Sequence, residues 1–126
     1  MPVVLVVEDD SELLQVLTDA LADEGWLALG AGSGAEALQI ARSRGVDVVL
    51  ADLLLPGGNG LELERKFQAI PTLANIPFVF MTGSLTEVSK IGPRPVLLKP
   101  FSLHQATAAL AASLDREDAV VASCGH

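Results

Sequence analysis

The stretch VDVVLADLLLPGG, residues 46–58, sets one carboxylate, Asp52, between two apolar blocks. The β-branched run before Asp52 predicts a strand that is buried on both faces, and the Pro-Gly-Gly at the end predicts a turn. A charge in such a run costs free energy unless another group pairs with it. Two explanations are open: Asp52 is a solvated residue at a strand end, or the protein keeps it for chemistry.

Four further short apolar runs predict strands, and helical patterns separate them. The five predicted strands cover residues 2–7, 26–31, 46–52, 76–82 and 95–99. The predicted helices cover residues 8–25, 32–45, 61–70, 85–91 and 102–114. Asp10 is expected to open the first helix, and capping boxes mark two others, Ser33 with Glu36 and Ser102 with Gln105.

This alternation predicts one α/β domain of the doubly wound, flavodoxin-like kind. With the strands numbered in chain order, we expect a five-stranded parallel sheet of order 2-1-3-4-5 with helices on both faces. The segment that joins the fourth and fifth strands is short. We expect the domain to cover residues 1–118 and a C-terminal tail to cover residues 119–126.

The chain is strongly acidic, with 16 acidic and 8 basic residues, a net charge of −8 and no Lys or Arg before Arg42. This balance argues against nucleic acid and anionic membranes as partners of the domain. No apolar run is long enough to span a bilayer and no signal segment precedes the first strand, so we expect a cytoplasmic protein. The single Cys124 excludes an internal disulfide framework, and Cys124 with His126 offers too few ligands for a metal site.

Polar side chains follow four of the five predicted strands. The first strand ends in Glu8 and Asp9, the third in Asp52, the fourth in Thr82 and the fifth in Lys99. Because the carboxyl ends of parallel strands meet at one edge, where ligands bind in such sheets, we expect these side chains to lie close together. Three clustered carboxylates suit Mg²⁺, and a lysine and a hydroxyl suit anionic oxygens. The set therefore fits phosphoryl transfer.

Four segments that occur in this order, VVLVVEDD, DVVLADLLLPGGNGLEL, FMTG and LLKPF, resemble the receiver domain of bacterial response regulators, the CheY-like family. The likeness runs over about residues 3–115. It implies that a histidine kinase or a phosphotransfer protein phosphorylates Asp52, and that Thr82 and Lys99 contact the phosphoryl group. The Mg²⁺ ligands that it implies are Glu8, Asp9, Asp52 and the backbone carbonyl of Leu54.

The resemblance also implies a cis peptide bond before Pro100 and an unobstructed path to the acceptor beside Gly83. It implies a domain that catalyses only its own phosphoryl transfer and autodephosphorylation. The sequence departs from the family where an aromatic residue is usual, at Val96, and between Thr82 and Lys99, which lie closer together than usual. We therefore expect output by binding of a downstream protein through an atypical face.

Two alternatives remain open at this point. The first is a degenerate receiver-like interaction domain that phosphorylation does not regulate. The second is a small Mg²⁺-dependent phosphohydrolase. Such enzymes usually carry a second carboxylate just after the nucleophile, whereas Asp52 is followed by three leucines.

Overall fold

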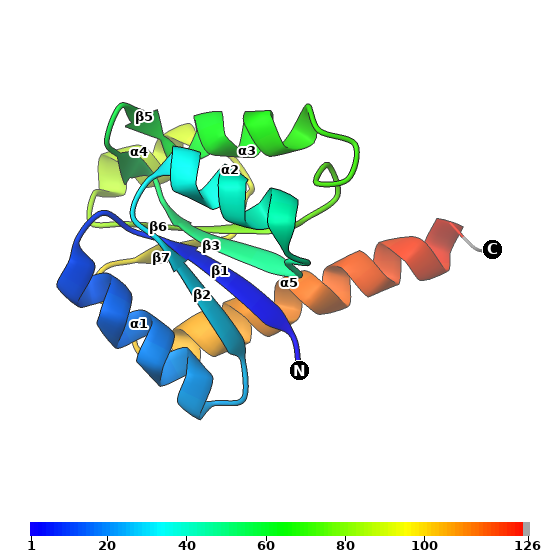
Figure 1. Cartoon of the computed structure of the whole chain (residues 1–126), viewed down its shortest axis with the longest axis horizontal. Coiled ribbons are helices and arrows are strands. Elements are labelled where there is room, and N and C mark those ends of the chain that lie inside the picture. The colour runs from blue at the N-terminus through cyan, green and yellow to red at the C-terminus, as the bar shows by residue number, and fades with distance from the viewer. Residues whose placement is uncertain (125–126) are drawn as a thin grey trace.

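A computed structural model describes the backbone of residues 1–124 and the side chains of residues 1–115. Its main sheet consists of five parallel strands: β1 (Val3–Val7), β2 (Leu27–Ala31), β3 (Val48–Asp52), β6 (Phe78–Thr82) and β7 (Val96–Leu98). Their spatial order is β2-β1-β3-β6-β7, which is 2-1-3-4-5 when only these strands are counted (Figure 1). The predicted fold class and strand order are confirmed.

Five helices surround this sheet: α1 (Ser11–Asp23), α2 (Gly34–Ser43), α3 (Gly60–Gln68), α4 (Leu85–Lys90) and α5 (Leu103–Cys124). Side chains of a strand alternate between the two faces, so each face of the sheet has its own core. Leu5 and Val7 of β1 share a core with residues of α2 and α3. Val4 and Val6 share the other core with residues of α1 and α5.

The helix starts follow the local sequence. The Asp10 carboxylate accepts hydrogen bonds from the backbone N–H groups of Glu12 and Leu13, so Asp10 caps α1 as expected. At α5 the capping box is complete: the Ser102 N–H donates to Gln105 Oε1 at 2.8 Å, and the Gln105 N–H donates to Ser102 Oγ at 3.0 Å.

The box at α2 forms only in part. The Glu36 N–H donates to Ser33 Oγ at 3.2 Å, but Glu36 Oε1 accepts from the Gly32 N–H at 2.6 Å. The Glu36 side chain therefore ties the preceding loop to α2.

Two elements differ from the sequence predictions. The last helix does not end near residue 114 but continues to Cys124, because no Gly or Pro interrupts residues 103–124. The proposed boundary at residue 118 thus lies inside α5, while Gly125, His126 and the side chain of Cys124 lie outside the described residues. The predicted loop after β3 contains a small antiparallel hairpin of β4 (Leu54–Leu55) and β5 (Gly58–Asn59).

The short connection between β6 and β7 contains the predicted short helix, α4. Ile91 is buried in the core that α2 and α3 share, and Arg94 Nε lies 2.9 Å from Glu64 Oε1 of α3. This segment is therefore anchored to α3. Within residues 1–124, no helix is both long enough and apolar enough to cross a membrane.

Candidate functional site

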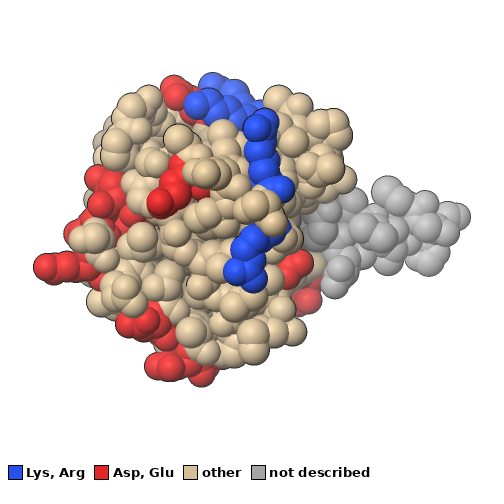
Figure 2. Space-filling model, in the orientation of Figure 1, with Lys and Arg blue, Asp and Glu red and all other residues tan. Residues whose placement is uncertain are grey.

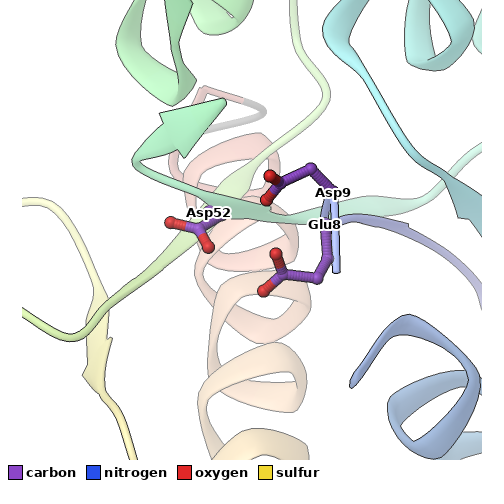
Figure 3. Close-up of side chains that lie close together, drawn as sticks. All are labelled: Glu8, Asp9 and Asp52. Carbon is purple, nitrogen blue, oxygen red and sulfur yellow. The ribbon is translucent and has the colours of Figure 1, made fainter. Parts of the chain in front are cut away.

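The register of the sheet brings three carboxylates together at its carboxyl edge. Val7 of β1 pairs with Ala51 of β3. Glu8 and Asp52 are the next residues after this pair, so they lie side by side at the edge of the sheet. Glu8, Asp9 and Asp52 each offer an oxygen atom, and these atoms all lie within 4.8 Å of one another (Figure 3). Glu8 and Asp52 are only 2% and 6% exposed, whereas Asp9 is exposed.

Lys99 supplies the positive charge of this cluster. Its Nζ lies 2.6 Å from Glu8 Oε1 and 2.7 Å from Asp52 Oδ2, so one ammonium group bridges two buried carboxylates. Backbone N–H groups bind the other oxygens: Leu54 donates to Asp52 Oδ1 at 2.9 Å, and Asp10 donates to Glu8 Oε2 at 3.2 Å. Charged and neutral donors together fix both carboxylates.

The environment shifts the pKa values of two of these groups. Burial raises the pKa of Glu8, with help from the charge of Asp52 and from Asp9, and the hydrogen bonds from Lys99 and the Asp10 N–H oppose it only in part. Burial alone would lower the pKa of Lys99, but hydrogen bonds and charge interactions with Asp52 and Glu8 outweigh it, so that pKa is raised. The native state therefore favours a charged lysine and disfavours a charged Glu8.

Thr82 ends β6 one residue after Met81, the register partner of Asp52. It is fully buried, and its Oγ1 accepts the Ser84 N–H at 3.2 Å. Among the described residues the Thr82 hydroxyl donates to no acceptor, so it can donate a hydrogen bond to the oxygen of a ligand. The Lys99 N–H donates to the Thr82 carbonyl at 2.7 Å, which ties the ends of β6 and β7 together.

The comparison with known proteins identifies the family of the chain. Residues 4–111 match the response regulator receiver domain family. The chain belongs to this family. Receiver domains are signalling domains of two-component systems, so the predicted class of function is confirmed.

The receiver domain is similar to several known proteins. It is 34% identical over 120 residues to the DNA-binding response regulator MtrA of Mycolicibacterium paratuberculosis. The aligned residues cover 91% of this chain and 52% of that protein. It is 32% identical over 121 residues to the sensory transduction protein RegX3 of Mycolicibacterium smegmatis, with 92% and 52% covered. The solved chemotaxis protein CheY4 of Vibrio cholerae superposes with a TM-score of 0.81 at 26% identity, over 90% of this chain and 99% of that one. The chain spans about half the length of these two curated relatives.

The structure of the receiver domain brings together the residues that the sequence singled out. The carboxylates and Lys99 are in direct contact or within 4.8 Å, and Thr82 lies at the same edge. The Lys99–Pro100 peptide is cis, as the resemblance implies. The backbone N–H of Leu54 contacts Asp52, whereas the role of its carbonyl as a metal ligand stays a prediction.

Sequence reasoning missed Gly60, which positions the acceptor segment. The Gly60 N–H donates to the Leu53 carbonyl at 3.0 Å, and a Cβ on Gly60 would lie 2.7 Å from the Asp52 carbonyl oxygen. Only a residue without a side chain allows α3 to begin so close to the end of β3. The Asn-Gly pair at the start of this helix was the available signal, because Asn59 is the N-cap of α3 and its Oδ1 accepts the Glu62 N–H.

Proposed function

We propose that this receiver domain accepts a phosphoryl group on Asp52 from the phosphohistidine of a histidine kinase or phosphotransfer protein, in a reaction that requires Mg²⁺. The supporting observation is the position of Asp52, which is buried at the carboxyl edge of the sheet between two acidic residues and Lys99. A carboxylate held beside a cation-binding cluster and an ammonium group suits the transfer of a phosphoryl group, whose oxygens carry the charge that must be neutralised.

The protein's own residues have distinct tasks in this reaction. A carboxylate oxygen of Asp52 attacks phosphorus, and an O–P bond forms as the P–N bond to the donor histidine breaks. The Lys99 ammonium, when it leaves a carboxylate that it now contacts, binds one phosphoryl oxygen. The buried Thr82 hydroxyl, whose oxygen accepts the Ser84 N–H, donates its hydrogen to a second phosphoryl oxygen. Gly83 leaves open space beside Thr82, since a Cβ there would meet nothing within 4 Å.

The donor set fits magnesium. Glu8, Asp9 and Asp52 offer hard oxygen ligands within 4.8 Å of one another, and the exposed Asp9 leaves one side open to solvent. We propose the backbone carbonyl of Leu54 as a fourth ligand. When bound, Mg²⁺ supplies positive charge for the carboxylates and the phosphoryl oxygens, which the single Lys99 cannot provide alone.

The donor is proposed to be a protein rather than only a small acyl phosphate. A hollow of about 450 Å³ borders Lys99 and is lined by apolar side chains of α1 and of the segment that begins α5. Val16 of α1, which is 62% exposed, and Phe101 both line this hollow. An apolar surface next to the acceptor suits a helical protein donor.

The output of the domain is proposed to be contact with a downstream protein, and the domain is proposed to hydrolyse its own phosphoaspartate. Val96 packs against the core in place of the usual aromatic residue, so an aromatic rotamer change at this position does not report the state of Asp52. Some relatives are named DNA-binding, and they are about twice as long as this chain. That this domain itself does not bind nucleic acid, and that it is cytoplasmic, stay predictions from its sequence.

Mass spectrometry after incubation with Mg²⁺ and either acetyl phosphate or phosphoramidate tests the proposal. We expect one phosphoryl adduct on the wild type and none on Asp52→Asn. The matched control is Asp47→Asn, which changes an exposed aspartate whose carboxylate accepts the Val3 N–H at 2.7 Å; it should retain the adduct. An adduct that survives Asp52→Asn would contradict the assignment. No adduct with either donor would favour the degenerate domain, and steady turnover of phosphomonoesters would favour the phosphohydrolase.

A further inference from the structure

A second hollow lies at the edge of the sheet opposite Asp52. It has a volume of about 320 Å³ and is formed by the end of α2, the residues just before β3 and the loop before β6. We call it the basal hollow. Its apolar lining comes from Ala41, Val46, Leu73 and Ile76, which belong to or pack against the core of α2 and α3, and its charged lining comes from the exposed Arg42 and Arg44.

The arginines of the basal hollow belong to a larger band of unpaired positive charge. Lys90, Arg94 and Lys99 each form an ion pair with an acidic residue. Among the described side chains, four further basic residues form none, and all lie in α2, at its C-cap or in α3: Arg42, Arg44, Arg65 and Lys66. Figure 2 shows basic side chains as a band across the face that α2 and α3 cover, with most acidic side chains elsewhere on this view. We call these four residues the basic band.

Local helix chemistry accounts for only part of this pattern. Arg42, Arg65 and Lys66 lie in the last turns of their helices, where the helix dipole favours a positive charge. Arg44 is the C-cap of α2, has an extended backbone (φ −139°, ψ 150°) and lines the basal hollow. In a chain of net charge −8, two exposed and unpaired arginines that line one hollow indicate a surface for an acidic partner.

We propose that the basal hollow, lined in part by Arg42 and Arg44, docks an acidic protein segment. One apolar side chain of that segment fills the hollow, and carboxylates on either side of it contact Arg42 and Arg44. A protein is favoured over a nucleic acid, because a phosphate backbone needs more neutralising contacts than two arginines on an acidic domain can offer, whereas a protein segment can place one side chain against the partly exposed Val46 and Ile76. The surface lies at the opposite edge of the sheet from Asp52, so docking here does not depend on the proposed phosphoryl transfer.

Two-dimensional amide NMR of the whole chain tests this proposal with a defined probe, a capped peptide of aspartate and glutamate residues around one leucine. We expect saturable shift changes confined to the amides of residues 41–46 and 72–76, with a dissociation constant on the order of 1 mM. In the double variant Arg42→Glu and Arg44→Glu the affinity should fall about tenfold or more, while Arg42→Lys with Arg44→Lys retains most of it. Lys90→Glu, a change in a basic residue outside the band, should leave it unaltered.

The same titration contains the results that would overturn the proposal. Absence of localised shifts, or equal shifts in the glutamate double variant, would exclude docking at this surface. Equal binding of the peptide with alanine in place of leucine would exclude the hollow as the anchor. The same amide shifts on concentrating the protein alone would assign the surface to a second copy, and shifts with duplex DNA but not with the peptide would assign it to nucleic acid. Asp52→Asn should bind the peptide like the wild type, which separates this proposal from the proposed acceptor role.

Discussion

Replacement of Asp52 by asparagine should stabilise the metal-free protein. Asp52 Oδ2 lies 2.7 Å from Lys99 Nζ, and oxygens of Glu8 and Asp9 lie within 4.8 Å of the Asp52 carboxylate. At an effective dielectric constant of about 20, the attraction is worth about 6 kcal/mol and the two repulsions together at least about 7 kcal/mol. The Coulomb energies therefore nearly cancel, and the desolvation of a carboxylate that is 6% exposed makes the net contribution of the charge unfavourable.

Asparagine removes this charge at nearly constant volume, and its side-chain oxygen can still accept the Leu54 N–H. We expect Asp52→Asn to gain about 1–2 kcal/mol in free energy of unfolding in metal-free buffer, measured by urea denaturation, and about 4–8 °C in Tm. Mg²⁺ at about 100 times its Kd should then stabilise the wild type by about 2.7 kcal/mol and the variant much less, which reverses their order.

Asp47→Asn is the control for this prediction, because Asp47 is an exposed aspartate on the opposite edge of the sheet. It should leave the response to Mg²⁺ unchanged. A less stable Asp52→Asn together with a wild type that does not respond to Mg²⁺ would refute both the balance of charges and the metal site.

Three further predictions follow from single contacts. Burial raises the pKa of Glu8 above its ordinary 4.5, so the metal-free wild type should lose stability as pH rises from 4.5 through the raised value. Urea denaturation between about pH 4 and pH 8 should show this loss in the wild type and not in Glu8→Gln. If the free energy of unfolding of both proteins changes with pH in the same way, the prediction is wrong. Among the described residues the buried hydroxyl oxygen of Ser113 has no hydrogen-bond partner, so Ser113→Ala should raise the free energy of unfolding by about 1 kcal/mol. A decrease would show that the hydroxyl is satisfied. Gly60→Ala should lower the free energy of unfolding by about 1–3 kcal/mol, because its Cβ would lie 2.7 Å from the Asp52 carbonyl oxygen. Gly34→Ala is the control and should lower it little, because its Cβ would lie 3.6 Å from the nearest side chain. Equal Tm values for the two variants would disprove the close approach at Gly60.

The fold and the members of the site could be predicted because both depend on strong local signals. Each buried strand is a short continuous apolar run, and each helix has its own cap or stop. Once the order of elements predicts a parallel sheet, the last residue of each strand or the one after it lies at one edge, so Glu8, Asp52, Thr82 and Lys99 come together without knowledge of any loop.

Features that depend on tertiary placement could not be predicted in this way. The double pairing of Lys99 requires the side-chain directions of three strands. The basic band combines residues from α2 and α3 that lie about twenty positions apart in the chain, and neither helix alone suggests it. The two-residue strands of the β4–β5 hairpin are too short for a periodic pattern, and the length of α5 depends on the absence of a stop signal rather than on a positive one.

The geometry of the site also explains how a short β6–β7 connection can coexist with the full set of residues that we propose for phosphoryl transfer. The relative positions of Glu8, Asp52 and Thr82 follow from the register of β1, β3 and β6, to which residues 83–95 contribute no strand pairing. Lys99 alone lies beyond that connection, and its place is fixed by the pairing of β7 with β6 and by its N–H bond of 2.7 Å to the Thr82 carbonyl. The chain can therefore shorten this segment and replace the aromatic residue by Val96 without moving a charged group of the site.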